Sequence, residues 1–322
     1  MIDLSNEFAI GIDIGGTNTK YGIVNHRGDI IEKGEIRTDA YPEIDDYINA
    51  LYETLTPIIK DHADEGKMKG IGIGAPNGNF YTGTIDYAPN LHWKGVIPLT
   101  KLVTAKFGLP CSLTNDANAA AVGEMNYGAA RGMRDFIMIT LGTGVGSGIV
   151  ANGQLIYGHD GFAGELGHTI IRHGGRKHWS TKLDGSLEAY CSATGIAITA
   201  RELLKKNGNS LLVKYKPEEI DSKLVCDLAL QGDETAQEVY RFTGQILGES
   251  LANFIMFSSP EAIILFGGVI KAGDLIMNPT REHMEKNLLP IFQDKVKLVF
   301  SELQEADAAI LGASALVWEM RE

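Results

Sequence analysis

The sequence predicts two related α/β domains. Three observations lead to this fold class. A glycine-rich loop joins two predicted strands near the N-terminus, in "IGIDIGGTNTKYGIVN" at 10–25. A second loop of the same kind occurs at 137–156, in "IMITLGTGVGSGIVANGQLI". Over the rest of the chain, helical and strand patterns alternate, which is typical of α/β proteins.

The first loop matches neither of the two common phosphate-binding glycine motifs. It lacks the spacing of the P-loop and the G-x-G-x-x-G of dinucleotide-binding proteins, both of which lead into a helix. Instead, 20–25 and 30–36 are predicted strands with a turn at 26–29. The order is therefore strand, loop, strand, turn, strand. A β-hairpin with a loose turn is the alternative interpretation of this stretch.

The second loop repeats that order. Residues 137–141 predict a buried strand, "GTGVGSG" forms the loop, and Asn152-Gly153 is a strong hairpin signal. Both copies contain "GIV". A repeat of this kind indicates two related domains that each begin with three strands. A nucleotide would lie between them, with one loop from each domain on its phosphates.

The remaining elements follow in chain order. In the first half we expect helices at 45–62, 98–107 and 118–127, and strands at 69–74 and 110–114. In the second half we expect helices at 187–206, 217–230, 234–257 and 307–320, and strands at 262–266 and 296–300. "FGGV" at 266–269 is predicted to end a strand and begin a helix, and 207–217 is the best candidate for a surface loop.

Composition limits the class of protein. The 322 residues are 44% hydrophobic, which is enough for the cores of two domains. A net charge of −12 argues against non-specific binding to nucleic acid. The N-terminus does not resemble a signal peptide, and no apolar run is long enough to span a membrane. Three widely spaced cysteines suggest reduced thiols in a cytoplasm.

Two acidic positions stand at the ends of predicted strands. Asp13 ends the first strand beside the glycine loop, where it could hold Mg²⁺ through water while Thr17 donates to a phosphate. The alternative is a simple turn residue. In "TNDANAAAVGE", Asp116 could act as a general base with Asn115 binding a hydroxyl group beside it. Helix capping is the alternative for both residues.

Further polar groups follow in the second half. Glu165 and His168 lie between glycines in "GFAGELGHTII", and Glu188 follows in "DGSLEAYCS". Two carboxylates and an imidazole can bind sugar hydroxyls or a metal, but a fourth metal ligand is not evident. Glu188 could also be an ordinary helix residue. Gly267 and Gly268 would let an adenine or ribose lie against the backbone.

Taken together, these motifs resemble the ROK family of sugar kinases and sugar-responsive repressors, within the actin-like ATPase superfamily. "DIGGTNTK", "GAPN", "APNLHW", "NDANAAAVGE", "LGTGVGSGIV", "GELGH" and "LFGGV" occur in the family's order over nearly the whole chain. The resemblance implies two actin-like, ribonuclease H-like α/β domains around a central cleft. We expect the N-terminal domain to comprise 1–118 plus 307–322, and the larger C-terminal domain 119–306.

The resemblance also implies roles for individual residues. Asp116 would be the catalytic base that activates the sugar hydroxyl. The sugar would be held by Asn90, Asn115, Asp116, Glu165, His168 and Glu188. ATP would be bound by Asp13, Gly15, Gly16, Thr17, Lys20, Thr143, Gly144, Gly267 and Gly268, with Mg²⁺ at Asp13.

The sequence departs from the family at one place. Many members carry C-x-C-G-x-x-G-C-x-E, whose three thiolates bind a structural zinc together with the histidine of "GELGH". Alignment on Glu188 places Trp179, Thr181 and Ser186 at the cysteine positions. None of these is a good zinc ligand, so we expect no structural zinc. Trp179 is expected to fill part of the vacated volume.

The function that this resemblance implies is an ATP-dependent hexose kinase in cytoplasmic carbohydrate metabolism. Glucose, phosphorylated at its 6-hydroxyl in glycolysis, is the expected substrate, with mannose, fructose or an N-acetylhexosamine as alternatives. A homodimer or other homo-oligomer is expected, without nucleic acid or membrane partners. A sugar-sensing repressor is less favoured, because too few residues precede Asp13 for a DNA-binding domain. A non-catalytic chaperone or filament module is disfavoured by Asn115-Asp116 and "GELGH".

Overall fold

Two five-stranded sheets with the same strand order carry the fold. The computed structural model describes residues 7–62, 66–206 and 209–320. The first sheet has the order β3-β2-β1-β4-β8, built from Ile30–Arg37, Asn18–Asn25, Glu7–Ile14, Lys67–Gly74 and Cys111–Thr114. The second has the order β11-β10-β9-β12-β13, built from Gln154–Leu155, Val145–Ala151, Phe136–Leu141, Ala262–Phe266 and Lys297–Phe300. The repeat predicted from the two glycine loops is therefore confirmed at the level of whole sheets.

Each sheet begins with antiparallel strands and continues with parallel ones. In the first sheet β1 pairs antiparallel with β2 and parallel with β4. In the second, β9 pairs antiparallel with β10 and parallel with β12. Each glycine loop is the connection between the two antiparallel strands, so it emerges where the parallel strands also end. This edge is where ligands of open α/β sheets bind.

One face of the first sheet is covered by α1 (Ile44–Asp61) and α2 (Leu99–Phe107). Tyr47, Leu51 and Leu55 of α1 are fully buried in one cluster with Ile10 and Ile71 of the sheet. A small sheet made of β5 (Gly78–Asn79), β6 (Thr84–Asp86) and β7 (Val96–Ile97) extends this part of the fold. These short strands were not predicted, because two or three residues give no detectable alternation.

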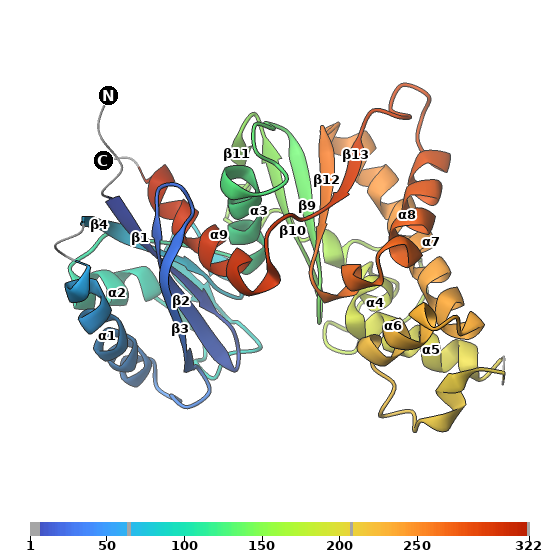
Figure 1. Ribbon diagram of the computed structural model, residues 1–322, viewed down its shortest axis with the longest axis horizontal. Helices are drawn as coiled ribbons and strands as arrows, with labels where there is room; N and C mark the ends of the chain where they lie inside the picture. Colours follow the sequence, from blue (N-terminus) through green and yellow to red (C-terminus); the bar gives the residue numbers. More distant parts are fainter. Residues whose placement is uncertain (1–6, 63–65, 207–208, 321–322) are drawn as a thin grey trace.

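Two helices, α3 (Asp116–Tyr127) and α9 (Glu305–Glu319), lie between the sheets (Figure 1). Glycines allow their close approach. A Cβ on Gly72 of β4 would lie 1.9 Å from the carbonyl oxygen of Ala313 in α9. A Cβ on Gly312 of α9 would lie 2.3 Å from the carbonyl oxygen of Ala119 in α3. A side chain at Gly72 would push α9 away from the sheet, and one at Gly312 would push α9 and α3 apart.

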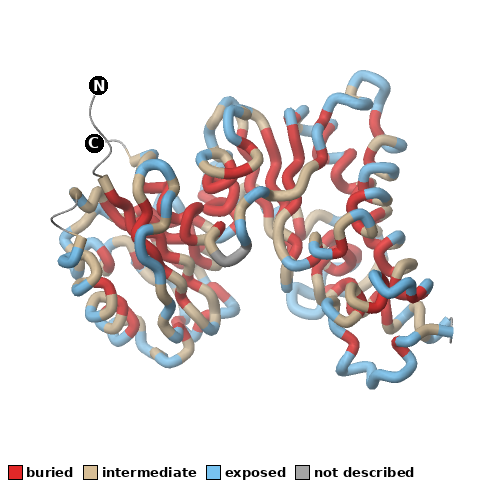
Figure 2. Tube along the Cα trace, viewed as in Figure 1, coloured by how far each residue is buried: buried red, intermediate tan, exposed pale blue. Residues whose placement is uncertain are grey.

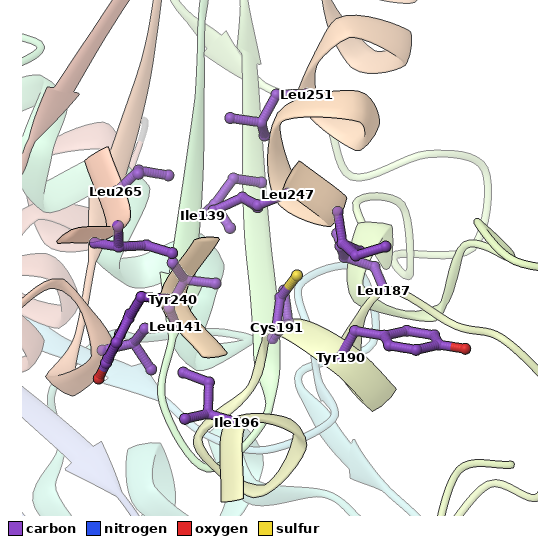
Figure 3. Close-up of a cluster of buried hydrophobic side chains, with 14 of the residues drawn as sticks. Ile139, Leu141, Leu187, Tyr190, Cys191, Ile196, Tyr240, Leu247, Leu251 and Leu265 are labelled. Atoms are coloured by element: carbon purple, nitrogen blue, oxygen red, sulfur yellow. The ribbon is translucent and has the colours of Figure 1, made fainter. Parts of the chain in front are cut away.

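The outer face of the second sheet packs against the remaining helices. These are α4 (Glu188–Cys191), α5 (Ala193–Leu204), α6 (Ser222–Leu230), α7 (Glu234–Ser258) and α8 (Asp274–Lys286). Figure 3 shows their core, in which Leu187, Cys191 and Leu247 from the helical layer pack against Ile139 and Leu265 of the strands. The buried residues follow the sheets and the helix faces turned toward them (Figure 2).

Several predicted elements differ in detail. The helix expected at 187–206 is two helices, because Ser192 ends α4 and caps α5 by accepting a hydrogen bond from Gly195 N–H. The helix expected at 217–230 begins only at Ser222, where Asp221 is the cap. "FGGV" leads into a 3-10 helix, Gly268–Ala272, and the unpredicted α8 follows it.

The expected loop at 207–217 is only partly a loop. Residues 207–208 lie outside the described part of the chain, and Leu211–Lys214 form a 3-10 helix. Leu212 is fully buried there, which a surface loop would not require. Within the described ranges, no helix has the length and apolar character needed to cross a membrane. The domain limits near 118 and 306 stay a prediction.

Candidate active site

The first glycine loop connects the end of β1 to the start of β2. Asp13 of β1 stands opposite Lys20 of β2 in the sheet register. Burial raises the pKa of Asp13 to about 6, the nearby Asp116 carboxylate adds to this, and Lys20 opposes it. A Cβ on Gly16 would lie 2.6 Å from the carbonyl oxygen of Asn90, so the loop packs directly against the segment that carries Asn90.

The start of α3 carries the proposed base. Asn115 is the cap of this helix, and its side-chain oxygen accepts a hydrogen bond of 2.8 Å from Ala117 N–H. The capping interpretation is thus confirmed for Asn115, whose amide NH₂ remains available to a ligand. Asp116 accepts from the same N–H at 2.8 Å. Its side chain is open to the cavity but surrounded by protein groups, and this desolvation raises its pKa.

The second glycine loop, between β9 and β10, is held from two sides. Thr140 Oγ1 accepts a hydrogen bond of 3.0 Å from Gly146 N–H. Glu188 Oε2 accepts one of 2.7 Å from Val145 N–H. A Cβ on Gly144 would lie 2.5 Å from that same Glu188 oxygen, so a side chain at this position would displace the carboxylate. Glu188 therefore joins the loop to α4.

The "GELGH" segment forms a 3-10 helix, Leu166–His168, next to this loop. Ser147 of β10 donates a hydrogen bond to the Gly164 carbonyl and fixes the segment on the sheet. His168 Nε2 lies 3.8 Å from Glu165 Oε2. Burial raises the pKa of Glu165, while His168 lowers it. His168 Nδ1 is buried without a hydrogen-bond partner among the described residues, as expected of a group that meets a ligand.

A cavity of about 570 Å³ unites most of the predicted site residues. Its walls include Asn90, Asn115, Asp116, Thr143, Gly144, Glu165, His168, Glu188, Gly267 and Gly268. The first loop, with Asp13, Gly15, Gly16, Thr17 and Lys20, is not part of these walls. It lies at their margin, through the contact of Gly16 with Asn90 and the electrostatic interaction of Asp13 with Asp116.

Comparison with known proteins assigns the family. The model of the ROK family matches residues 9–320. The chain belongs to the ROK family. A glucokinase from Thermotoga maritima is 36% identical, with 96% of this chain and 97% of that protein aligned. A glucokinase from Halalkalibacterium halodurans is also 36% identical, over 98% of this chain and 96% of the relative.

Solved structures agree with this assignment. A ROK glucokinase from Streptomyces griseus in complex with glucose and AMPPNP is 29% identical, with a TM-score of 0.79 over 97% of this chain and all of that one. A ROK hexokinase from Thermus thermophilus superimposes with a TM-score of 0.79 at 25% identity, over 97% of this chain and 98% of that one. The protein thus has the fold of the ROK sugar kinases, and the predicted actin-like fold class is confirmed.

The zinc segment of this ROK protein contains no thiolates. Trp179 and Thr181 line the cavity, and Ser186 is fully buried with no hydrogen-bond partner for its hydroxyl among the described residues. Across those residues, no group of three or more histidine, cysteine, aspartate or glutamate side chains is arranged to hold a metal ion. The residues at the zinc positions therefore do not fit the metal. The absence of zinc from the protein stays a prediction.

Sequence reasoning missed His178, which lines the same cavity. It precedes the first zinc position, is 1% exposed and lies 2.6 Å from Glu188 through its Nε2. Trp179, expected to fill part of the vacated volume, is 36% exposed and packs on the His178 ring at a centroid distance of 4.0 Å. No signal in the sequence separates this buried histidine from His173 nearby.

Proposed function

We propose that the protein is an ATP-dependent glucokinase that transfers the γ-phosphoryl group of ATP to the 6-hydroxyl of glucose. One observation carries the proposal. Asp116 opens into a cavity whose walls hold both polar side chains suited to a sugar and glycine loops suited to phosphates. The names of the Thermotoga and Halalkalibacterium relatives, and the glucose and AMPPNP in the Streptomyces structure, support it.

The nucleotide would lie along the glycine-rich walls. Gly144 and Gly267 leave no side chain between the backbone and a ligand, and a Cβ on Gly267 would already collide with Leu141. Thr17 and Thr143 would donate hydrogen bonds to phosphates. Gly15, Gly16 and Lys20 would bring the first loop to the phosphates.

Asp13 is the residue that would hold Mg²⁺, through water. Its carboxylate is largely desolvated and has one nearby cation, Lys20, which leaves negative charge for a divalent ion to neutralise. When bound with ATP, Mg²⁺ would neutralise charge on the transferred phosphoryl group.

Asp116 would act as the general base. The sugar hydroxyl oxygen attacks the γ-phosphorus while its proton passes to the Asp116 carboxylate, and the bond from that phosphorus to the ADP oxygen breaks. The hydrogen bond from Ala117 N–H holds the carboxylate in place. Its raised pKa makes its carboxylate a better proton acceptor than that of an ordinary aspartate.

The sugar would be held by Asn90, Asn115, Glu165, His168 and Glu188. We place the last three around the anomeric and 2-positions. Three polar groups there favour a hydroxyl over an acetyl methyl, because buried polar groups without partners are costly. This favours glucose over N-acetylated hexoses. Mannose differs from glucose only in configuration at that position.

A substrate panel tests the proposal. ADP release is measured with glucose, mannose, fructose, N-acetylglucosamine and N-acetylmannosamine, each over a range of concentrations. We expect glucose to have the highest kcat/KM. If another hexose has a kcat/KM at least ~10-fold above that of glucose, which is about 1.4 kcal/mol, the substrate assignment is wrong and the kinase assignment stands. No ADP release with any of them would reject the kinase.

We infer further that the enzyme is cytoplasmic, acts in glycolysis and forms a homodimer or other homo-oligomer. The free state of Cys111, Cys191 and Cys226 supports a reducing compartment. Fractionation of cells and light scattering of the purified protein test location and oligomeric state.

A further inference from the structure

His178 is buried immediately before the positions that carry thiolates in zinc-binding ROK proteins. Its Nδ1 accepts hydrogen bonds from the backbone N–H groups of Ser180, at 3.2 Å, and Thr181, at 3.0 Å. A ring nitrogen that accepts from N–H groups carries no proton of its own. The ring proton is therefore on Nε2.

This protonated nitrogen faces the Glu188 carboxylate. Nε2 lies 2.6 Å from Glu188 Oε1, although the N–H is not directed at that oxygen within hydrogen-bond limits. The contact is thus chiefly an electrostatic attraction between a ring N–H and a carboxylate. The Trp179 ring packs on the imidazole at a tilt of 30°, and the His168 ring lies edge-on at a centroid distance of 6.1 Å. These contacts leave the imidazole little freedom to turn.

The two oxygens of Glu188 have different partners. Oε2 accepts from Val145 N–H in the second glycine loop, at 2.7 Å, and Oε1 faces His178. The backbone of Glu188 is fixed as well, because its neighbours Leu187 and Ala189 are fully buried. Only rotation of the carboxylate about its last bonds remains, and His178 is the side chain placed to limit it.

The segment around His178 is held by protein contacts. Arg176 donates from its side chain to the carbonyls of Ala189 and Gly195, at 2.7 and 3.1 Å. Its backbone N–H donates to the Tyr190 hydroxyl at 2.6 Å. Protein hydrogen bonds thus connect the segment to α4 and α5 without a metal ion.

We propose that His178 is a positioning residue for Glu188 and so sets the affinity of the site for its sugar. The proposal rests on the proposed function, in which Glu188 contacts glucose. His178 orients the carboxylate between the sugar and the Val145 N–H. In zinc-binding ROK proteins, thiolates and the metal organise the neighbouring segment, which carries none of these thiolates here.

Two variants separate this role from a purely structural one. In His178→Asn, the amide oxygen replaces Nδ1 and keeps an acceptor for Ser180 and Thr181, but nothing reaches Glu188. In His178→Gln, the amide group reaches the place of Nε2, but the acceptor for the two backbone N–H groups is lost. We expect His178→Asn to lower the Tm less than His178→Gln does, and to raise the KM for glucose about tenfold, the effect of one lost contact to a charged group.

The Gln variant should show the reverse. We expect a lower Tm and a KM for glucose within about threefold of wild type, because the Glu188 contact remains. The KM for ATP and the kcat should change less than the KM for glucose in His178→Asn. An unchanged KM in His178→Asn overturns the proposal. So does a rise in KM that follows the loss of Tm in both variants.

A double-mutant cycle with Glu188→Gln tests whether His178 acts through Glu188. We expect His178→Asn to have almost no further effect on glucose KM in the Glu188→Gln background. Equal effects in both backgrounds overturn the proposal.

The same cycle measured as unfolding free energy without sugar is independent of the substrate. If no hexose supports ADP release by the wild type, the proposed function fails. The unfolding cycle then still shows whether His178 and Glu188 are energetically coupled. Absence of coupling there also overturns the proposal.

Discussion

Ser301 donates a hydrogen bond to the carboxylate of Glu124, a residue 177 positions earlier in the chain. Glu124 is fully buried on α3, and its other oxygen accepts from Ala129 N–H at 2.7 Å. Ser301 in turn accepts from Leu303 N–H at 3.1 Å, at the start of the segment that leads into α9. The chain passes from the first sheet to the second through α3, and it returns through the segment between β13 and α9. The Glu124 carboxylate joins these two crossings.

Neutralising Glu124 should stabilise the protein at neutral pH. Burial raises the pKa of Glu124, so the folded state favours the protonated form. The stability that this form contributes is present below about pH 4.5 and is lost as pH rises through the folded pKa. We expect Glu124→Gln to have an equal or higher Tm than wild type at pH 7.5, and no advantage at the acidic end.

The matched variant Glu124→Ala should lower the Tm at both pH values. It leaves Ala129 N–H buried without a partner, which costs on the order of 1–3 kcal/mol. Thermal unfolding of the three proteins at several pH values checks both expectations. If Gln proves as damaging as Ala, the charge of Glu124 is needed for the fold and this account is wrong.

The two sheets should approach each other when sugar and nucleotide bind. The predicted hinge consists of the two crossings, near 115–120 and 305, and closure would exclude water from the phosphoryl group. Small-angle scattering under saturating glucose and a non-hydrolysable ATP analogue should show a smaller radius of gyration. The nucleotide alone serves as the control. An unchanged radius with both ligands would argue against closure.

Asp116→Asn should lose activity without losing sugar affinity. Asparagine keeps the size of the side chain and an oxygen to accept from Ala117 N–H, but it cannot take the proton. We expect kcat to fall at least ~10²-fold, the scale of general-base catalysis, with glucose affinity little changed. Glu53→Gln, on the exposed side of α1, is the control. Near-normal turnover of Asp116→Asn would remove Asp116 from the base role.

The raised pKa of Asp116 predicts the acid limb of the pH profile. The base must be ionised, so activity falls as pH drops through its pKa. Because desolvation raises that pKa, the fall should begin at a higher pH than for an ordinary aspartate with a pKa of 3.8. A profile of kcat/KM for glucose from pH 4.5 to 8 measures it. Glu165 also has a raised pKa, so the profile is repeated with Glu165→Gln.

The purified protein should contain no stoichiometric zinc. The positions of the three family thiolates hold Trp179, Thr181 and Ser186, none of which binds zinc well. Elemental analysis should find well under one zinc per chain. Treatment with a strong chelator, which is then removed before assay in excess Mg²⁺, should leave Tm and activity unchanged. One tightly held zinc per chain would mean that other residues of this chain ligate it.

The glycine spacing and the alternation of apolar residues could be interpreted from local sequence alone. They predicted the repeated three-strand units, the strand at 262–266 within its exact limits, and most helices within a few residues. These patterns are local, because a strand or an amphipathic helix shows its period within about ten residues. The short strands β5 to β7 and the break at Ser192 leave too little local signal.

The sequence by itself determined the family, the repeated fold and a set of candidate site residues, because these depend on motifs that can be compared along the chain. Only the tertiary structure decided which of them meet. It placed Glu188 against Val145 and Glu124 against Ser301, and it brought the unpredicted His178 beside Glu188. These contacts join segments far apart in the chain, and their partners are selected by packing in three dimensions, which leaves no periodic signal in the sequence.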